Sequence, residues 1–179
     1  KVASVASFFV SRVDAAVDAE LEKAGNTELQ GKIDIANSKL AYARFKELFS
    51  GDDWEALAEK GATAQRVLWA STSTKNPDYP DTLYVDSLVG AHTVNTVPPA
   101  TLDALQDHGT ASDTIEDGMD EAKSQIEQLS GLGIDLDAIT QNLQDDGVDK
   151  FADSFKSLMS SIEEKRDRIT SEKKSTSLS

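Results

Sequence analysis

The sequence predicts an α/β fold in which a small parallel sheet of three strands is followed by helices. Three short segments rich in apolar and β-branched residues favour strands, at about residues 2–10, 65–72 and 92–98. Helical segments separate them, and strands joined by helices pair in parallel through right-handed crossovers. Three strands are too few for a core on both faces of the sheet, so we expect further strand partners at its two edges.

The first strand is almost entirely apolar or small from Val2 to Val10. Continuous apolar character without alternation predicts burial on both faces of the strand, as in a parallel sheet. A helix follows directly, because Val13, Val17 and Leu21 recur at helical spacing and Gly25 stops the pattern. Since nothing precedes this strand, its expected partner lies outside the 179 residues.

The middle of the chain alternates helices with the other two strands. A long helix is predicted at about 28–49, and Asp52 and Asp53 suit the first turn of a short one. After the second strand, a loop with two prolines leads to a helix at about 82–88. The third strand is followed by a helix that ends at Gly109.

Three further helices are predicted toward the C-terminus, at about 113–130, 136–145 and 148–169. Three aspartates between the last two are interpreted as helix ends and N-caps: Asp145, Asp146 and Asp149. One apolar stripe on the last helix is interpreted as core packing: Val148, Phe151, Phe155, Leu158 and Ile162. We expect one domain over 1–172 and a polar tail over 173–179.

The composition excludes several classes of function. A formal net charge of −14 argues against nonspecific binding to nucleic acid or to an anionic membrane. The absence of cysteine excludes disulfides, thiolate metal sites and a cysteine nucleophile. No apolar run reaches the roughly 20 residues that a membrane helix needs. The chain also lacks the glycine-rich dinucleotide motif, the P-loop and the serine nucleophile elbow, and its acidic loop segments do not have the ligand spacing of an EF-hand.

Ligands of parallel α/β folds bind at the carboxyl ends of the strands. These ends carry the following polar and aromatic candidates: Ser7, Phe9, Ser11 and Arg12 at the first; Ser71, Thr72, Ser73, Thr74 and Lys75 at the second; Asn95 and Thr96 at the third. A cationic side chain beside several hydroxyl groups is suited to binding the oxyanion of a phosphate. Each residue also has an ordinary alternative: a surface ion pair for the cations, turn and cap chemistry for the hydroxyls, a structural hydrogen bond for Asn95. His92 and His108 are interpreted as surface or capping residues.

Several blocks of sequence resemble the C-terminal half of transaldolase in its longer bacterial and photosynthetic form. In order, these blocks are SVASFFVSRVD, LWASTSTKNP, DTLYV, TVNTVP, TLDALQDHG and GVDKFADSFKSLMSSI. The resemblance implies a (β/α)8 barrel, with the three strands as its sixth, seventh and eighth. It also implies transfer of a dihydroxyacetone unit between sugar phosphates in the non-oxidative pentose phosphate pathway. This transfer proceeds through a lysine Schiff base and needs no metal or organic cofactor.

The resemblance assigns substrate-binding roles to five residues. Ser7, Phe9 and Arg12 match the family pattern Ser-x-Phe-x-x-Arg on the sixth strand, in which the serine and phenylalanine line the dihydroxyacetone pocket and the arginine binds phosphate. Ser71 matches a serine that ends the seventh strand. Many transaldolases have a second phosphate-binding arginine two residues later. Here Ser73 occupies that position, and Lys75 is the candidate substitute.

The catalytic residues that the resemblance implies lie on the first, third and fourth strands, which these 179 residues do not include. We therefore expect a fragment that is inactive alone and whose partners are sugar phosphates and the missing N-terminal half, with a homo-oligomer left open. The expected location is the cytoplasm, or a plastid in a photosynthetic eukaryote. The alternative is a non-enzymatic, acidic, helical interaction module.

Overall fold

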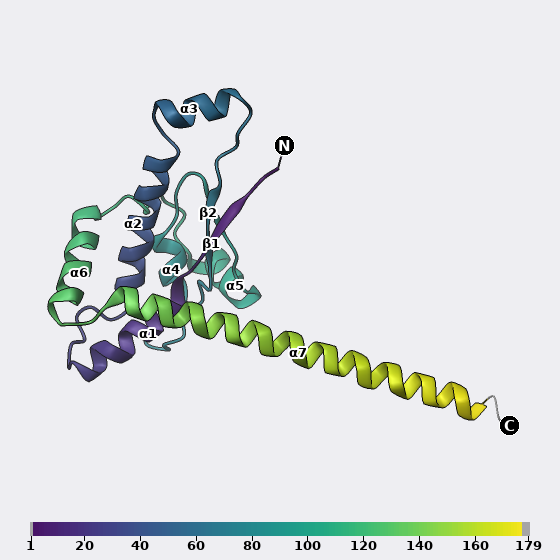
Figure 1. Cartoon of the computed structure of the whole chain (residues 1–179). Helices are drawn as coiled ribbons and strands as arrows, with labels where there is room; N and C mark the ends of the chain where they lie inside the picture. The colour runs from purple at the N-terminus through teal and green to yellow at the C-terminus, as the bar shows by residue number, and fades with distance from the viewer. Residues whose placement is uncertain (1, 177–179) are drawn as a thin grey trace. The chain divides into compact units, whose positions relative to one another are not determined.

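The computed structural model describes residues 2–176, and their side chains as far as residue 171 (Figure 1). It divides the chain into two compact units, residues 1–139 and 140–179. The predicted polar tail, 173–179, falls partly outside the described residues; its backbone is helical as far as Thr176. None of the helices in the described part is both long and apolar enough to cross a membrane.

The first unit contains a three-stranded parallel sheet, as predicted. Its strands are β1 (Val5–Phe9), β2 (Arg66–Ala70) and β3 (Thr93–Asn95), in the order β1-β2-β3. The register aligns Phe8 with Trp69 and Trp69 with Asn95. Because all strands run the same way, the segments that follow them meet at one edge of the sheet.

Six helices of the first unit connect or follow these strands: α1 (Val10–Lys23), α2 (Ile33–Leu48), α3 (Asp52–Glu59), α4 (Leu83–Ser87), α5 (Pro99–His108) and α6 (Met119–Gly131). Two begin later than predicted. Before α2, the Asn26 side chain accepts hydrogen bonds from the backbone N–H groups of Glu28 and Leu29, which closes a turn in place of a helical turn. Before α6, Gly118 has a left-handed backbone conformation with φ 64°. Residues 113–118, where the helix was predicted to begin, form no helix.

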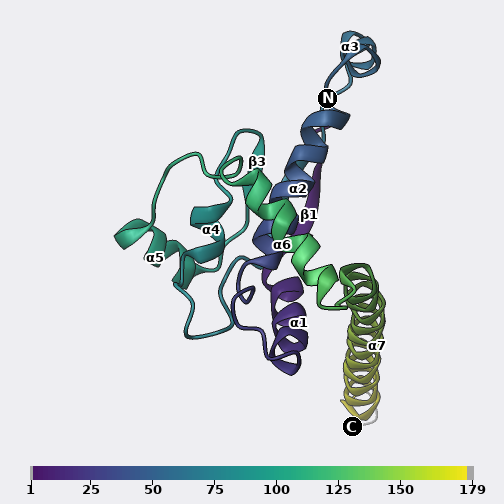
Figure 2. The same cartoon turned by 90° about the vertical axis from the view of Figure 1, so that its left-hand side faces the viewer.

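The core lies on one face of the sheet. Trp69 of the central strand is fully buried, and the Phe8 ring meets it edge-on with centroids 5.8 Å apart. The other buried residues of this cluster come from α1, α2, β2, α4, the residue after α4 and the chain before α6: Val10, Tyr42, Phe45, Val67, Tyr84, Leu88 and Ile115. Figure 2 shows α6 lying along α2. It is α2 that contributes residues to this core.

The prediction that the first strand is buried on both faces is wrong for this chain. Four of the five β1 residues are exposed. Val5 and Phe9, which point to the face opposite Phe8, are 38% and 42% exposed. The physical reason is that the core cluster covers only one face of the sheet, so the second face of β1 lacks the packing layer that a continuous apolar strand needs.

The last helix differs from prediction in two ways. Residues 136–145 and 148–169 belong to one helix, α7 (Leu136–Thr176), so Asp145, Asp146 and Asp149 are interior residues and not caps. An interior glycine costs only about 1 kcal/mol, and Lys150 pairs with Asp146 at 3.8 Å across Gly147. The apolar stripe predicted as core is exposed, with Phe151 at 77%.

Candidate functional site

The carboxyl end of β1 presents an arginine without a carboxylate partner. Arg12 is exposed and is the third residue of α1. Its guanidinium carbon lies 4.6 Å from the centroid of the Phe9 ring, which is the geometry of a cation–π contact. No carboxylate of the described residues forms an ion pair with Arg12, in a chain with 32 acidic residues. The ordinary alternative, a surface ion pair, is therefore not what the structure contains.

The position of Arg12 is electrostatically unfavourable unless an anion is present. The N-terminus of a helix carries a partial positive charge, which repels a cation in the first turn. No acidic residue lies in the first turn of α1. The partial positive charge of the helix N-terminus and the guanidinium of Arg12 therefore lie at the same place. An anion bound there would interact favourably with both.

The end of β2 is joined to the start of α1 by two hydrogen bonds. The Ser11 N–H donates to the Ser71 carbonyl oxygen at 2.9 Å, and the two hydroxyl oxygens lie 2.8 Å apart. Ser71 has φ 57°, a left-handed conformation that residues other than glycine rarely adopt. Strained backbone of this kind concentrates at functional sites. The structure thus brings Ser71 next to Ser11, the neighbour of Arg12.

The end of β2 is also joined to β3. The Thr72 hydroxyl donates to the Asn95 side-chain oxygen at 2.8 Å, and the Thr96 N–H donates to the Trp69 carbonyl at 3.0 Å. Thr72 is fully buried. The ordinary alternative for Asn95, a structural hydrogen bond, therefore describes its contact in this structure.

The remaining two candidates lie apart from this hydrogen-bonded group. Ser7 is exposed and pairs in register with Leu68, on the same open face of the sheet as Phe9. Lys75 is exposed, and its ammonium donates to the Ser73 hydroxyl at 3.1 Å. The structure records no contact between Lys75 and Arg12.

A buried carboxylate network behind this edge was missed by the sequence analysis. Asp14 is fully buried and accepts hydrogen bonds from the Tyr84 hydroxyl at 2.7 Å and from the Asp34 N–H at 3.2 Å. Asp34 is also fully buried and accepts from the Asn37 amide at 3.2 Å. Three atoms in the described residues are buried without a partner: Asp34 Oδ2, Ser38 Oγ and Trp69 Nε1. Through these hydrogen bonds, Asp14 and Asp34 connect α1 with α2 and α4 in addition to the apolar packing.

Burial sets the protonation of these two carboxyls. Desolvation raises the pKa of Asp14 to about 6, although the Tyr84 hydrogen bond opposes the shift. Desolvation also raises the pKa of Asp34 well above its usual value, and the nearby charge of Asp14 acts in the same direction. The Tyr84 hydroxyl has a raised pKa because it is buried beside Asp14. One sequence signal was present: Asp14 lies on the apolar stripe of α1, between Val10 and Val17.

A third carboxylate, Asp18, holds the loop before α2. Its two oxygens accept from the Gly31 N–H at 3.1 Å and from the Tyr79 hydroxyl at 2.6 Å. Gly31 has φ 70° and is buried, and a Cβ there would lie 2.9 Å from the Tyr79 ring. These contacts pack the loop after β2 against α1 and the start of α2.

The histidines lie at the surface, as predicted. His108 is the last residue of α5, and its ring nitrogens lie 2.9 Å from an Asp81 oxygen and 3.1 Å from an Asp107 oxygen. Hydrogen bonding to these carboxylates, Asp81 first, raises the pKa of His108. His92 is exposed at φ 60°, before β3 and so at the amino end of the sheet.

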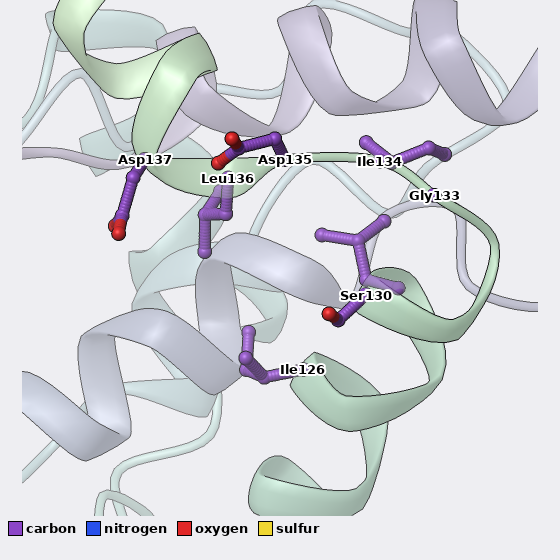
Figure 3. A pocket seen from close by; sticks show the side chains of 8 residues that line it. Ile126, Ser130, Gly133, Ile134, Asp135, Leu136 and Asp137 are labelled. Atoms are coloured by element: carbon purple, nitrogen blue, oxygen red, sulfur yellow. The ribbon is translucent and has the colours of Figure 1, made fainter.

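A cavity of about 470 Å³ lies between the end of α6 and the start of α7 (Figure 3). Its lining is apolar at Ile126, Ile134 and Leu136, with two carboxylates at Asp135 and Asp137. Asp135 already accepts from the Ala138 N–H at 3.1 Å, which caps α7. Because its charged groups are carboxylates, this cavity does not suit a phosphate.

Comparison with known proteins agrees with the resemblance in the sequence. The family model described as transaldolase/fructose-6-phosphate aldolase matches residues 1–162. A transaldolase of Neisseria meningitidis serogroup A is 50% identical over 158 residues, which cover 88% of this chain and 44% of the relative. A transaldolase of Frankia alni is 50% identical over 165 residues, covering 90% and 44%. One of Trichodesmium erythraeum is 44% identical over 183 residues, covering 95% and 48%. The chain spans about half the length of the curated relatives it matches.

Proposed function

Because this chain belongs to the transaldolase/fructose-6-phosphate aldolase family, we propose that it is the C-terminal half of a transaldolase barrel. In this proposal β1, β2 and β3 are the sixth, seventh and eighth strands of a (β/α)8 barrel. The complete polypeptide transfers a dihydroxyacetone unit between sugar phosphates through a lysine Schiff base on a strand outside these 179 residues. Family membership favours this proposal over a non-enzymatic interaction module.

The open side of the sheet supports the half-barrel. One face of β1 is exposed at Val5, Ser7 and Phe9, while Phe8 on the other face packs against the core cluster. In a (β/α)8 barrel, helices cover the outer face of the sheet, and side chains from all the strands fill the interior. A sheet with helices on one face and apolar residues exposed on the other is what half of such a barrel would present.

Arg12 is the observation that carries the proposed substrate class. It is exposed and unpaired with any carboxylate of the described residues, and it lies in the first turn of α1 at the carboxyl end of β1. A guanidinium at a helix N-terminus suits the phosphate of a sugar phosphate, because the fork of N–H donors and the helix potential act on the same anion.

The other four residues have supporting roles in this proposal. Ser7 and Phe9 line the dihydroxyacetone pocket from the open face of β1, and Phe9 also supports the guanidinium of Arg12. Ser71 contributes a hydroxyl beside Ser11. Lys75 is the second phosphate ligand, and from its contact with Ser73 it must swing toward the anion. We therefore expect Lys75 to contribute less than Arg12.

Phosphate binding can be tested on the 179-residue chain itself. Fructose 6-phosphate, added to isotope-labelled protein, should shift the amide NMR signals of residues 9–12 and 71–73, and fructose should not. Arg12→Ala should abolish these shifts. Arg44→Ala is the matched control, because Arg44 is an exposed helical arginine paired with Glu47 at 2.7 Å. Equal shifts with fructose, or equal loss in both variants, would contradict the role of Arg12.

The chemistry requires a separate test. The chain alone, mixed with fructose 6-phosphate and erythrose 4-phosphate and then treated with borohydride, should show neither turnover nor a reduced lysine adduct. A chimaera that places the N-terminal part of one of the relatives named above before this chain should show both. Activity of the chain alone, or a folded chimaera that traps no substrate, would refute the half-barrel proposal.

A further inference from the structure

Ser11 is a buried serine that contacts the candidate site through Ser71. It is the second residue of α1, next to Arg12, and is 1% exposed. Among the described residues, the one hydrogen-bond partner of its hydroxyl is the Ser71 hydroxyl at 2.8 Å. Its backbone N–H donates to the Ser71 carbonyl oxygen at 2.9 Å. These two bonds tie the start of α1 to the turn that follows β2.

The burial of the two serines decides which hydroxyl donates to the other. A serine hydroxyl has one proton to donate and two lone pairs that accept. If Ser71 donated, the Ser11 proton would be buried without an acceptor, which is more costly than leaving a hydrogen bond to water. Ser71 is half-buried, so its own proton can reach solvent or a ligand. Ser11 is therefore the donor of this bond and Ser71 the acceptor.

The direction of this bond decides what Ser71 offers to an anion. The oxygens of a phosphate dianion are acceptors, so a hydroxyl that binds them must donate. A Ser71 hydroxyl whose proton pointed to Ser11 would present its lone pairs to the anion and repel it. When Ser71 accepts from Ser11, its proton is free, and the accepted bond polarises the hydroxyl and strengthens its own donation.

We propose that Ser11 is a positioning residue, which donates its proton to Ser71 and so leaves the Ser71 proton for an oxygen of a bound phosphate. Ser11 itself is buried and does not contact the ligand. Its backbone bond also helps to hold Ser71 in the left-handed conformation at φ 57°. The identity of the ligand rests on the proposed function, whereas the direction of the hydroxyl bond does not.

The direction can be measured on the ligand-free 179-residue chain. In protein labelled with carbon-13 serine, a hydroxyl proton that exchanges slowly with water should show a through-bond correlation with the Ser11 β-carbon. The signal should disappear in Ser11→Ala. A protected hydroxyl proton that correlates with the Ser71 β-carbon would overturn the proposal. Absence of a protected proton at both serines would also overturn it.

The effect on binding is tested with fructose 6-phosphate, followed by the amide NMR signals of residues 9–12 and 71–73. Ser11→Ala should weaken binding about three- to tenfold, because Ser71 loses the bond that orients and polarises its hydroxyl. Ser11→Thr, which keeps the hydroxyl, should restore most of the affinity. Ser38→Ala is the matched control and should leave affinity unchanged, since Ser38 is a fully buried serine whose hydroxyl has no partner in the described residues.

The double variant separates a positioning role from a structural one. If Ser11 acts through Ser71, the chain with both Ser11→Ala and Ser71→Ala should bind no more weakly than Ser71→Ala alone. Multiplied losses, or a parent that binds while Ser11→Ala binds equally well, would overturn the inference and leave the proposed function intact. A parent that binds no fructose 6-phosphate would refute the proposed substrate class together with the ligand role of Ser11. The ligand-free measurement would then still decide the direction of the bond.

Discussion

The buried Asp14 carboxyl predicts that the free energy of unfolding falls as pH rises from 4 to 7. Its pKa is about 6 in the folded protein and 3.8 as the model value for an unburied aspartate. Between these values the folded state holds a proton that the unfolded state has lost, so raising the pH favours unfolding. The penalty is absent below about pH 3.8, grows through the window and is complete above about pH 6. Asp34, with a pKa raised for the same reason, adds to the fall.

The size of the effect follows from the shift. About two pH units correspond to roughly 3 kcal/mol of unfavourable folding free energy at pH 7. For a domain of this size, that is about 6–12 °C in Tm. The penalty comes mainly from desolvation, so a neutral side chain of the same shape should remove it.

Asp14→Asn is that neutral side chain. The asparagine oxygen can still accept from the Asp34 N–H, and its amide can donate to the Tyr84 oxygen, which is also an acceptor. We expect the variant to be more stable than the parent at pH 7.5, by up to about 3 kcal/mol, and nearly equal at pH 4. Asp103→Asn, an exposed position on α5, is the control for the lost charge alone.

The assay is urea unfolding followed by circular dichroism at several pH values. The quantity compared is the difference between variant and parent, because relief of the −14 net charge at low pH affects both chains equally. A difference that is the same at pH 4 and pH 7.5, or a variant less stable at pH 7.5, would refute the reasoning. A gain in the Asp103→Asn control as large as that of Asp14→Asn would also refute it.

Three further outcomes are expected. In the chimaera, Arg12→Ala should lower kcat/KM for fructose 6-phosphate by roughly ten- to a hundredfold, because a charged hydrogen bond contributes about 1.5–3 kcal/mol. With dihydroxyacetone as donor, kcat/KM should change little. Equal losses on both donors would mean that Arg12 supports the fold. Gly31→Ala should lower Tm measurably, since its Cβ would lie 2.9 Å from the Tyr79 ring at φ 70°; an unchanged thermal transition would show that the ring can move aside. Thr72→Val should cost about 1–2 kcal/mol in chemical unfolding, because the Asn95 oxygen loses its donor; a cost near zero would mean that water replaces the hydroxyl.

The three strands, their parallel order and the helices between them could be predicted from the sequence. These features depend on local periodicity, which each segment carries within itself: the apolar run of β1, the stripe on α1 and the glycine after α5. The location of Arg12 at the end of β1 could be predicted for the same reason, because it follows directly from where the strand stops.

Whether an apolar segment is buried depended on the tertiary structure. β1 and the apolar stripe predicted as core on the last helix have patterns typical of buried elements, yet both are exposed. Burial needs a neighbouring surface, and a local pattern does not say whether one exists. The continuity of α7 through Gly147 could not be predicted from the glycine itself. One interior glycine costs less helix stability than the helical segments on either side contribute.

The polar contacts behind the candidate site could be identified only from the tertiary structure. Ser11 meets Ser71, and Asp14 meets Tyr84, across 60 and 70 residues of sequence. From the sequence, Asp14 was only an acidic residue on an apolar stripe, and its raised pKa depends on which groups surround it in three dimensions. Periodicity therefore determined the elements of this protein, and the distances between side chains far apart in the chain decided its electrostatics, because desolvation and hydrogen bonding act only between groups that folding brings together.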